Sequence, residues 1–128
     1  MVVDTSAIVA IFLAEVAAPR FLRAIETADR PLISAATFVE TSIVLTGRTV
    51  PAARQLVVEF LRDGNFQIEP VTAEQATVAV DAFARYGKGR HRAGLNLGDC
   101  FAYALAKSTG EPLLYKGNDF SRTDVASA

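Results

Sequence analysis

Four acidic residues stand where a charged side chain is unusual or where a strand is expected to end. Asp4 is the only charged residue among the first 13. Glu40 and Asp99 each have mostly apolar or small neighbours at helical spacing, so each carboxylate falls on or beside a buried stripe. Asp119 follows the last apolar strand-like run. Carboxylates that gather repel one another unless a cation joins them, and Mg²⁺ is the ion that prefers oxygen ligands and phosphate substrates.

Each of these acids also has a purely structural explanation. Asp4 can cap a helix, and Glu40 can reach water or an arginine from the edge of its helix. Asp99 is the third residue after Asn96, which is the spacing of a capping box. Asp119 stands in a turn between Asn118 and Asp124, and such turns are commonly rich in Asp and Asn.

The remaining composition excludes several chemistries. The chain has 128 residues, of which 51% are hydrophobic and 21% charged, so it predicts one globular domain covering residues 1–128. A single Cys and a single His rule out a zinc finger and catalysis by paired histidines. With no membrane-length apolar stretch and no basic leader, the cytoplasm is the expected compartment.

Basic charge is concentrated in one glycine-rich stretch, although the net charge is only −1. Lys88, Arg90 and Arg92 lie within residues 87–94, and Lys116 stands near the last group of acids. These side chains could hold the phosphates of a nucleic acid beside an acidic pocket. The alternative is a solvated loop without a ligand.

The periodicity predicts strands that alternate with helices. We expect strands at 2–3, 31–33, 66–71 and 113–115, with an edge pairing near Val125, and helices at 5–13, 16–28, 34–46, from Pro51 to the turn at 63–65, 72–86 and 96–110. Such alternation is typical of an α/β fold with a parallel sheet, in which ligands bind at the carboxyl ends of the strands. Asp4 and residues 116–119 follow directly after two of these strands.

Four segments together resemble PIN-domain ribonucleases, and more closely the VapC-type toxins of type II toxin–antitoxin systems. They are VVDTSA at the start, the helix that carries Glu40, LNLGDCFAYALAK at 95–107 and LLYKGNDF at 113–120. The resemblance implies an α/β/α sandwich around a short parallel sheet of about four or five strands. It also implies an endoribonuclease that depends on Mg²⁺, with Mn²⁺ able to substitute, and that hydrolyses RNA with metal-activated water.

The resemblance assigns roles to individual residues. Asp4, Glu40, Asp99 and Asp119 are the expected catalytic acids. Asp4 and Asp99 are the first choices as metal ligands, with Glu40, Asp119 and Asp124 as further candidates, Thr5, Ser6 and Asn118 as supporting residues, and Lys88, Arg90, Arg92 and Lys116 as RNA-binding residues. The last motif departs from a common family pattern, because Gly117 stands where many members have an acid. Asp119 is the nearest replacement and Asp124 the next.

The resemblance also implies partners: an RNA substrate, a VapB-type antitoxin, and a homodimer or a larger toxin–antitoxin assembly. The residues also bear on two other classes of protein. A phosphate-accepting aspartate domain needs a second neighbouring acid, which Asp4-Thr5-Ser6 lacks. A catalytically inactive PIN-like module that binds RNA or a partner remains the alternative.

Overall fold

A computed structural model describes residues 1–48 and 50–128 of the chain. Its sheet has four parallel strands in the order β3-β2-β1-β4. The strands are β1 (Val2–Val3), β2 (Leu32–Ser34), β3 (Gln67–Glu69) and β4 (Leu113–Leu114). The α/β class and the short parallel sheet expected from the sequence are therefore confirmed.

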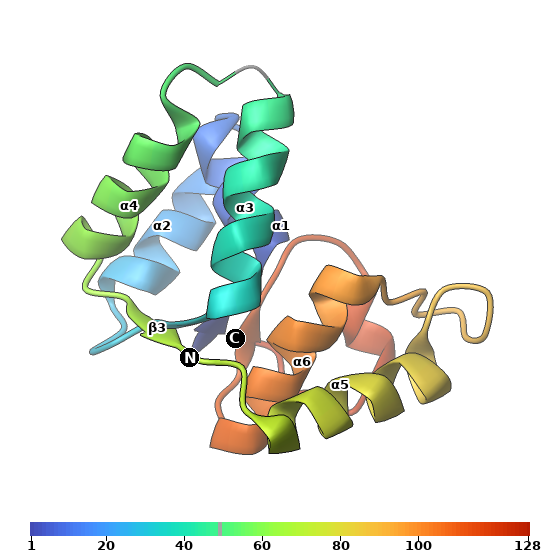
Figure 1. Cartoon of the computed structure of the whole chain (residues 1–128). Helices are drawn as coiled ribbons and strands as arrows, with labels where there is room; N and C mark the ends of the chain where they lie inside the picture. The colour runs from blue at the N-terminus through green and yellow to red at the C-terminus, as the bar shows by residue number, and fades with distance from the viewer. Residues whose placement is uncertain (49) are drawn as a thin grey trace.

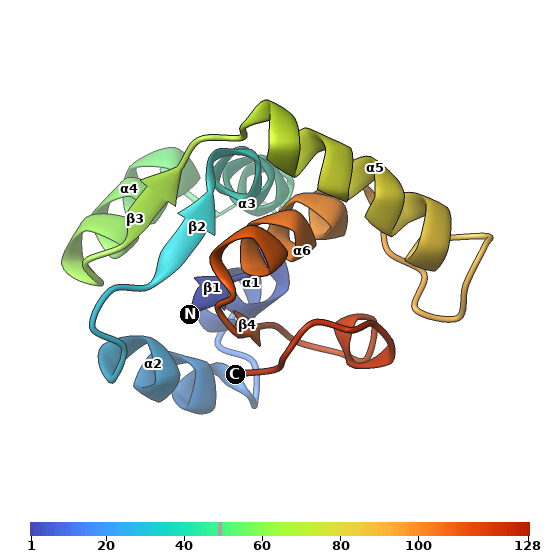
Figure 2. The same cartoon turned by 90° about the horizontal axis from the view of Figure 1, so that it is seen from below.

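Helices cover both faces of this sheet (Figures 1 and 2). They are α1 (Thr5–Phe12), α2 (Ala18–Glu26), α3 (Ala35–Gly47), α4 (Ala53–Asp63), α5 (Ala73–Tyr86) and α6 (Leu97–Thr109), followed by the short 3₁₀ helix η1 (Phe120–Arg122). Within the described residues, no helix is long and apolar enough to cross a membrane.

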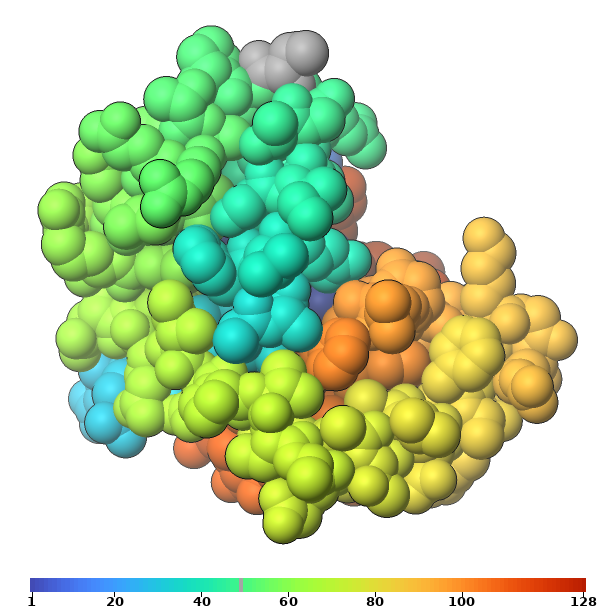
Figure 3. Space-filling view, in the orientation of Figure 1, coloured from blue at the N-terminus to red at the C-terminus, as the bar shows by residue number. Residues whose placement is uncertain are grey.

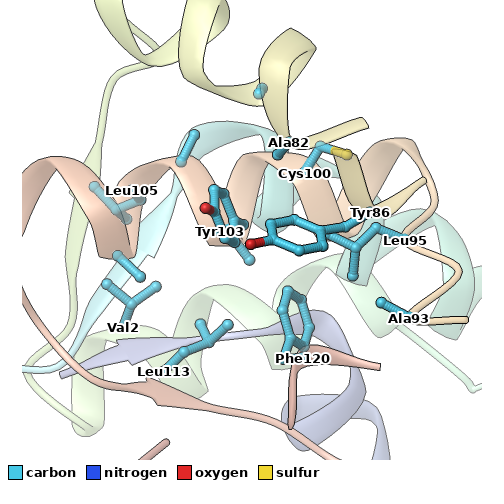
Figure 4. Packing of buried hydrophobic residues seen from close by; sticks show 14 residues of the cluster. Val2, Ala82, Tyr86, Ala93, Leu95, Cys100, Tyr103, Leu105, Leu113 and Phe120 are labelled. Carbon is cyan, nitrogen blue, oxygen red and sulfur yellow. The ribbon is translucent and has the colours of Figure 1, made fainter. Parts of the chain in front are cut away.

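The pleat of the strands divides the core into two clusters. Val2 and Leu113 point toward the α5–α6 side, where they pack with Tyr103 and Phe120 (Figure 4). Their neighbours in the strands, Val3 and Leu114, belong to the second cluster, which includes residues of α1, α2, α3 and α4. Successive side chains of a strand face opposite sides, so even two-residue strands contribute to both clusters.

Two helices begin directly after strands, at the carboxyl ends of β1 and β2. Asp4 follows β1 and caps α1, and Ser34 ends β2 and caps α3. From β1 the chain adds β2 and then β3 on one side, and the connection after β3 returns to place β4 on the other side of β1. The point at which the strand order reverses therefore lies between β1 and β4. In parallel α/β sheets, this switch point at the carboxyl ends of the strands is where ligands bind.

Several sequence-based boundaries differ from the structure. Pro51 was expected at the first position of a helix, and this was wrong: α4 begins at Ala53, after Ala52 in the left-handed conformation (φ 52°). The strand expected at 66–71 is limited to Gln67–Glu69. The edge pairing expected near Val125 forms at Ser127, which bridges to Leu113.

Candidate active site

The four predicted acids come from separate parts of the chain, and their charges interact. Asp4 follows β1, Glu40 lies in the second turn of α3, Asp99 in the first turn of α6, and Asp119 just before η1. The charges of the other three all raise the pKa of Asp99. Figure 1 shows α1, α3 and the start of α6 beside one another, and Figure 3 shows a notch between α3 and α6.

Asp4 is the most buried of these acids, with only 2% of its surface exposed. Its Oδ2 accepts hydrogen bonds from the backbone N–H of Ser6 (2.8 Å) and from the Ser6 hydroxyl (2.6 Å), which caps α1. Its Oδ1 is buried without a hydrogen-bond partner. Burial raises the pKa of the Asp4 carboxyl, the bonds from Ser6 oppose the rise, and the charge of Glu40 adds to it. The helix cap thus explains one carboxylate oxygen and leaves the other unexplained.

Glu40 is held by contacts with two other helices. The Thr5 hydroxyl of α1 donates to Glu40 Oε2 at 2.6 Å, and Thr5 accepts in turn from the Thr41 hydroxyl at 3.2 Å. The Glu40 carboxylate also packs against Gly98, where an added Cβ would stand 2.1 Å from Oε1 and 2.3 Å from Oε2. The absence of a side chain at Gly98 therefore lets the carboxylate lie against the first turn of α6.

Asp99 forms the capping box that its spacing from Asn96 predicts. Asp99 Oδ2 accepts from the Asn96 backbone N–H at 2.8 Å, and Asn96 Oδ1 accepts from the Asp99 N–H at 2.9 Å. Burial raises the pKa of Asp99 to about 7. The bond from Asn96 opposes this rise, whereas the charges of Asp4 and Glu40 add to it. As at Asp4, the cap uses one carboxylate oxygen.

The two candidates for the fourth acid differ in their surroundings. Asp119 is exposed, as is Asn118, and its charge reaches Asp99. Asp124 instead accepts a hydrogen bond from the Tyr103 hydroxyl at 2.5 Å, and Lys107 lies 3.4 Å from its Oδ2. The Tyr103 bond lowers the pKa of Asp124. Asp124 is therefore engaged with Tyr103 and Lys107, whereas the negative charge of Asp119 adds to the rise in the pKa of Asp99.

Three of the predicted basic residues lie on one exposed loop. Lys88, Arg90 and Arg92 are exposed on the loop between α5 and α6. The Arg90 guanidinium lies 5.9 Å from the centre of the Phe83 ring, and the Arg92 carbonyl accepts from Arg122 at 2.6 Å. The loop is thus tied to both α5 and η1, with its charged side chains in solvent.

Lys116 is linked to the acidic site through its backbone. Its N–H donates to Ser6 Oγ at 2.9 Å, and the same hydroxyl donates to Asp4. Its side-chain ammonium contacts the carboxylate of Glu15. Sequence reasoning named Lys116 as a basic group at the site but did not foresee this ion pair.

A hard divalent cation fits the donor atoms of this site. Among residues 1–48 and 50–128, no three His, Cys, Asp or Glu side chains are gathered as a ready-made metal-binding group. Mg²⁺, however, is usually held by one or two carboxylates and several waters. Asp4 has a buried carboxylate oxygen without a hydrogen-bond partner, and the pKa of Asp99 is raised. A bound cation would stabilise the ionised form of both carboxylates.

Two residues of the site were missed from the sequence. Thr41 adjoins Glu40 in the sequence, and in the structure it is fully buried and donates a hydrogen bond to Thr5. Gly98 precedes Asp99 within the motif at 95–107, and its lack of a Cβ makes room for Glu40. A polar residue beside an acid on an apolar helix face was the available signal for Thr41.

The raised pKa of Asp99 predicts a pH-dependent stability that asparagine should remove. Between about pH 4 and the folded pKa of about 7, the folded protein retains a proton that the unfolded chain releases. Its free energy of unfolding therefore falls as pH rises through this window. We expect Asp99→Asn, which keeps a cap acceptor, to be more stable than the wild type by about 1–2 kcal/mol at pH 8 and not at pH 4. Urea unfolding in EDTA measures this, and equal pH dependence of the two proteins would contradict it.

Comparisons with known proteins identify the family. The family model of the PIN domain matches residues 1–126. The chain is 48% identical over 128 residues to Ribonuclease VapC30 of Mycobacterium tuberculosis, covering 99% of this chain and 97% of that protein. Its fold resembles the crystal structure of M. tuberculosis VapC20, a sarcin-ricin loop cleaving toxin, with a TM-score of 0.80, 18% identity and coverage of 99% and 97%. A toxin–antitoxin complex from Klebsiella pneumoniae matches with a TM-score of 0.75, 20% identity and coverage of 99% and 95%. The chain therefore belongs to the PIN-domain family and, within it, to the VapC group.

Proposed function

We propose that this chain is a Mg²⁺-dependent endoribonuclease toxin restrained by a VapB-type antitoxin, with residues 1–128 acting as one PIN domain. The observation that carries the proposal is the buried, unpaired Oδ1 of Asp4 at the carboxyl end of β1, with Glu40 and Asp99 near enough for their charges to interact with that of Asp4. Membership of the VapC group supports ribonuclease activity, because its members at 48% identity are named ribonucleases.

In the proposed reaction, Asp4 and Asp99 would hold the cation through the carboxylate oxygens that their helix caps do not use. A bound divalent ion would stabilise the charge that develops on the phosphate and would make water a better nucleophile. Glu40 Oε2 accepts from Thr5, and Oε1 would orient the attacking water and take its proton. The water oxygen bonds to phosphorus as the P–O3′ bond breaks, and the departing O3′ takes a proton from solvent, which leaves a 5′-phosphate and a 3′-hydroxyl.

The flanking cations complete the proposed substrate site. An acidic pocket repels RNA, so nearby positive side chains are needed to hold the backbone phosphates. Lys88, Arg90 and Arg92 extend from a loop that is anchored to α5 and η1. Lys116 reaches the same edge of the sheet but would exchange its contact with Glu15 for a phosphate.

Mapping of RNA 5′-phosphate ends in cells tests the proposed activity. We expect brief expression of the wild type to produce discrete new ends, because cleavage leaves a 5′-phosphate. Asp99→Asn should produce none, and Asp81→Asn, which removes an exposed carboxylate on α5, should match the wild type. With soluble folded protein present, an absence of ends in every strain would favour the inactive RNA- or partner-binding module instead.

A pair of asparagine variants tests the assignment of the fourth acid. We expect Asp119→Asn to lower the cleavage rate about tenfold, because the negative charge of Asp119 interacts with that of Asp99. Asp124→Asn should retain the rate and instead lower the unfolding temperature, because it weakens the contacts with Tyr103 and Lys107. Rates measured on one mapped RNA, well below each variant's unfolding temperature, separate the effects. The reverse pattern would assign the role to Asp124.

A further inference from the structure

The buried hydroxyl of Thr41 departs from the usual pattern for a threonine within a helix. Ser and Thr in helices often donate back to the carbonyl four residues earlier. In α3, Ser42 does so to Phe38 at 2.9 Å, and Thr46 does so to Ser42 at 2.8 Å. Thr41 Oγ1 instead donates across to α1, where it meets Thr5 Oγ1 at 3.2 Å. Its hydrogen bond therefore joins two helices.

The Thr5 hydroxyl connects Thr41 with Glu40. Thr5 donates its single hydroxyl proton to Glu40 Oε2 at 2.6 Å, so its oxygen is available to accept from Thr41. Thr5 is 8% exposed and Thr41 is fully buried. Away from water, successive hydrogen bonds polarise and strengthen one another. The orientation of the Glu40 carboxylate is therefore coupled to a side chain that does not touch it.

Packing alone does not account for a hydroxyl at position 41. Valine has nearly the shape of threonine and no polar group to remove from water. In the described part of the chain, the hydrogen bond of the Thr41 side chain leads only to Thr5, and from there to Glu40. The same carboxylate also packs against Gly98, where an added Cβ would overlap it.

We propose that Thr41 is a positioning residue, which acts through Thr5 to fix the carboxylate of Glu40 so that Oε1 remains available for the reaction. The proposal deepens, and rests on, the RNA hydrolysis proposed above. It makes the hydroxyl of residue 41, rather than its volume, the property that matters.

Variants at position 41 separate the hydroxyl from the volume. We expect Thr41→Val to lower kcat about fivefold on a synthetic RNA that spans a cleavage site mapped in cells, with KM unchanged, because one neutral hydrogen bond is lost. Thr41→Ser should restore kcat to within about twofold. Thr46→Val, which removes a hydroxyl bonded within the same helix, is the matched control and should leave kcat unchanged. In a Glu40→Gln background, Thr41→Val should cause no further loss.

A second readout needs neither metal nor RNA. In the metal-free protein at fixed pH, the ¹³C resonance of the Glu40 side-chain carboxyl should shift in Thr41→Val and return in Thr41→Ser. Thermal unfolding confirms that each variant is folded. An unmoved resonance in Thr41→Val, or a serine variant as impaired as the valine variant, would overturn the proposal. If the wild type cleaves no RNA, the proposed function fails, whereas the resonance still decides the positioning role.

Discussion

The burial of the Asp4 carboxylate at the end of β1 is the constraint on which the acidic site depends. Removing a carboxylate from water costs several kcal/mol unless other groups stabilise it. Ser6 provides two hydrogen bonds, but both go to Oδ2, and Oδ1 is left without a partner. Glu40 and Asp99 add negative charge nearby instead of relieving it. The protein alone therefore does not fully stabilise the negative charge of these carboxylates, and a cation or bound protons must do so.

Structural and chemical roles coexist in the same side chains. Asp4 and Asp99 both cap helices, and each cap uses only Oδ2. A helix N-terminus favours negative charge, so capping places a carboxylate where a rigid element fixes its direction. The capping box of Asn96 and Asp99 thus does not argue against a ligand role. When a cap uses one carboxylate oxygen, the rigid helix also fixes the direction of the other oxygen.

The sequence predicted the features that depend on local pattern. The strand and helix order, the capping box of Asn96 and Asp99 and the place of Asp4 at the end of β1 follow from periodicity, spacing and topology. The start of α4 was misjudged because Ala52 adopts the left-handed conformation, which no local rule predicts for alanine. The role of Thr41 and the space at Gly98 were missed for another reason. Both arise from contacts between helices, and spacing along one helix does not reveal them.

The sheet order has a consequence for when the site comes into existence during synthesis. β1 carries Asp4 and lies between β2 and β4, yet β4 pairs with it through Leu113, at the far end of the chain. Asp99 and Asp119 are also translated late. A nascent chain that lacks its last quarter has Asp4 and Glu40 but lacks Asp99, Asp119 and strand β4. The complete acidic site therefore forms only once nearly all of the chain has left the ribosome, because these contacts are far apart in sequence.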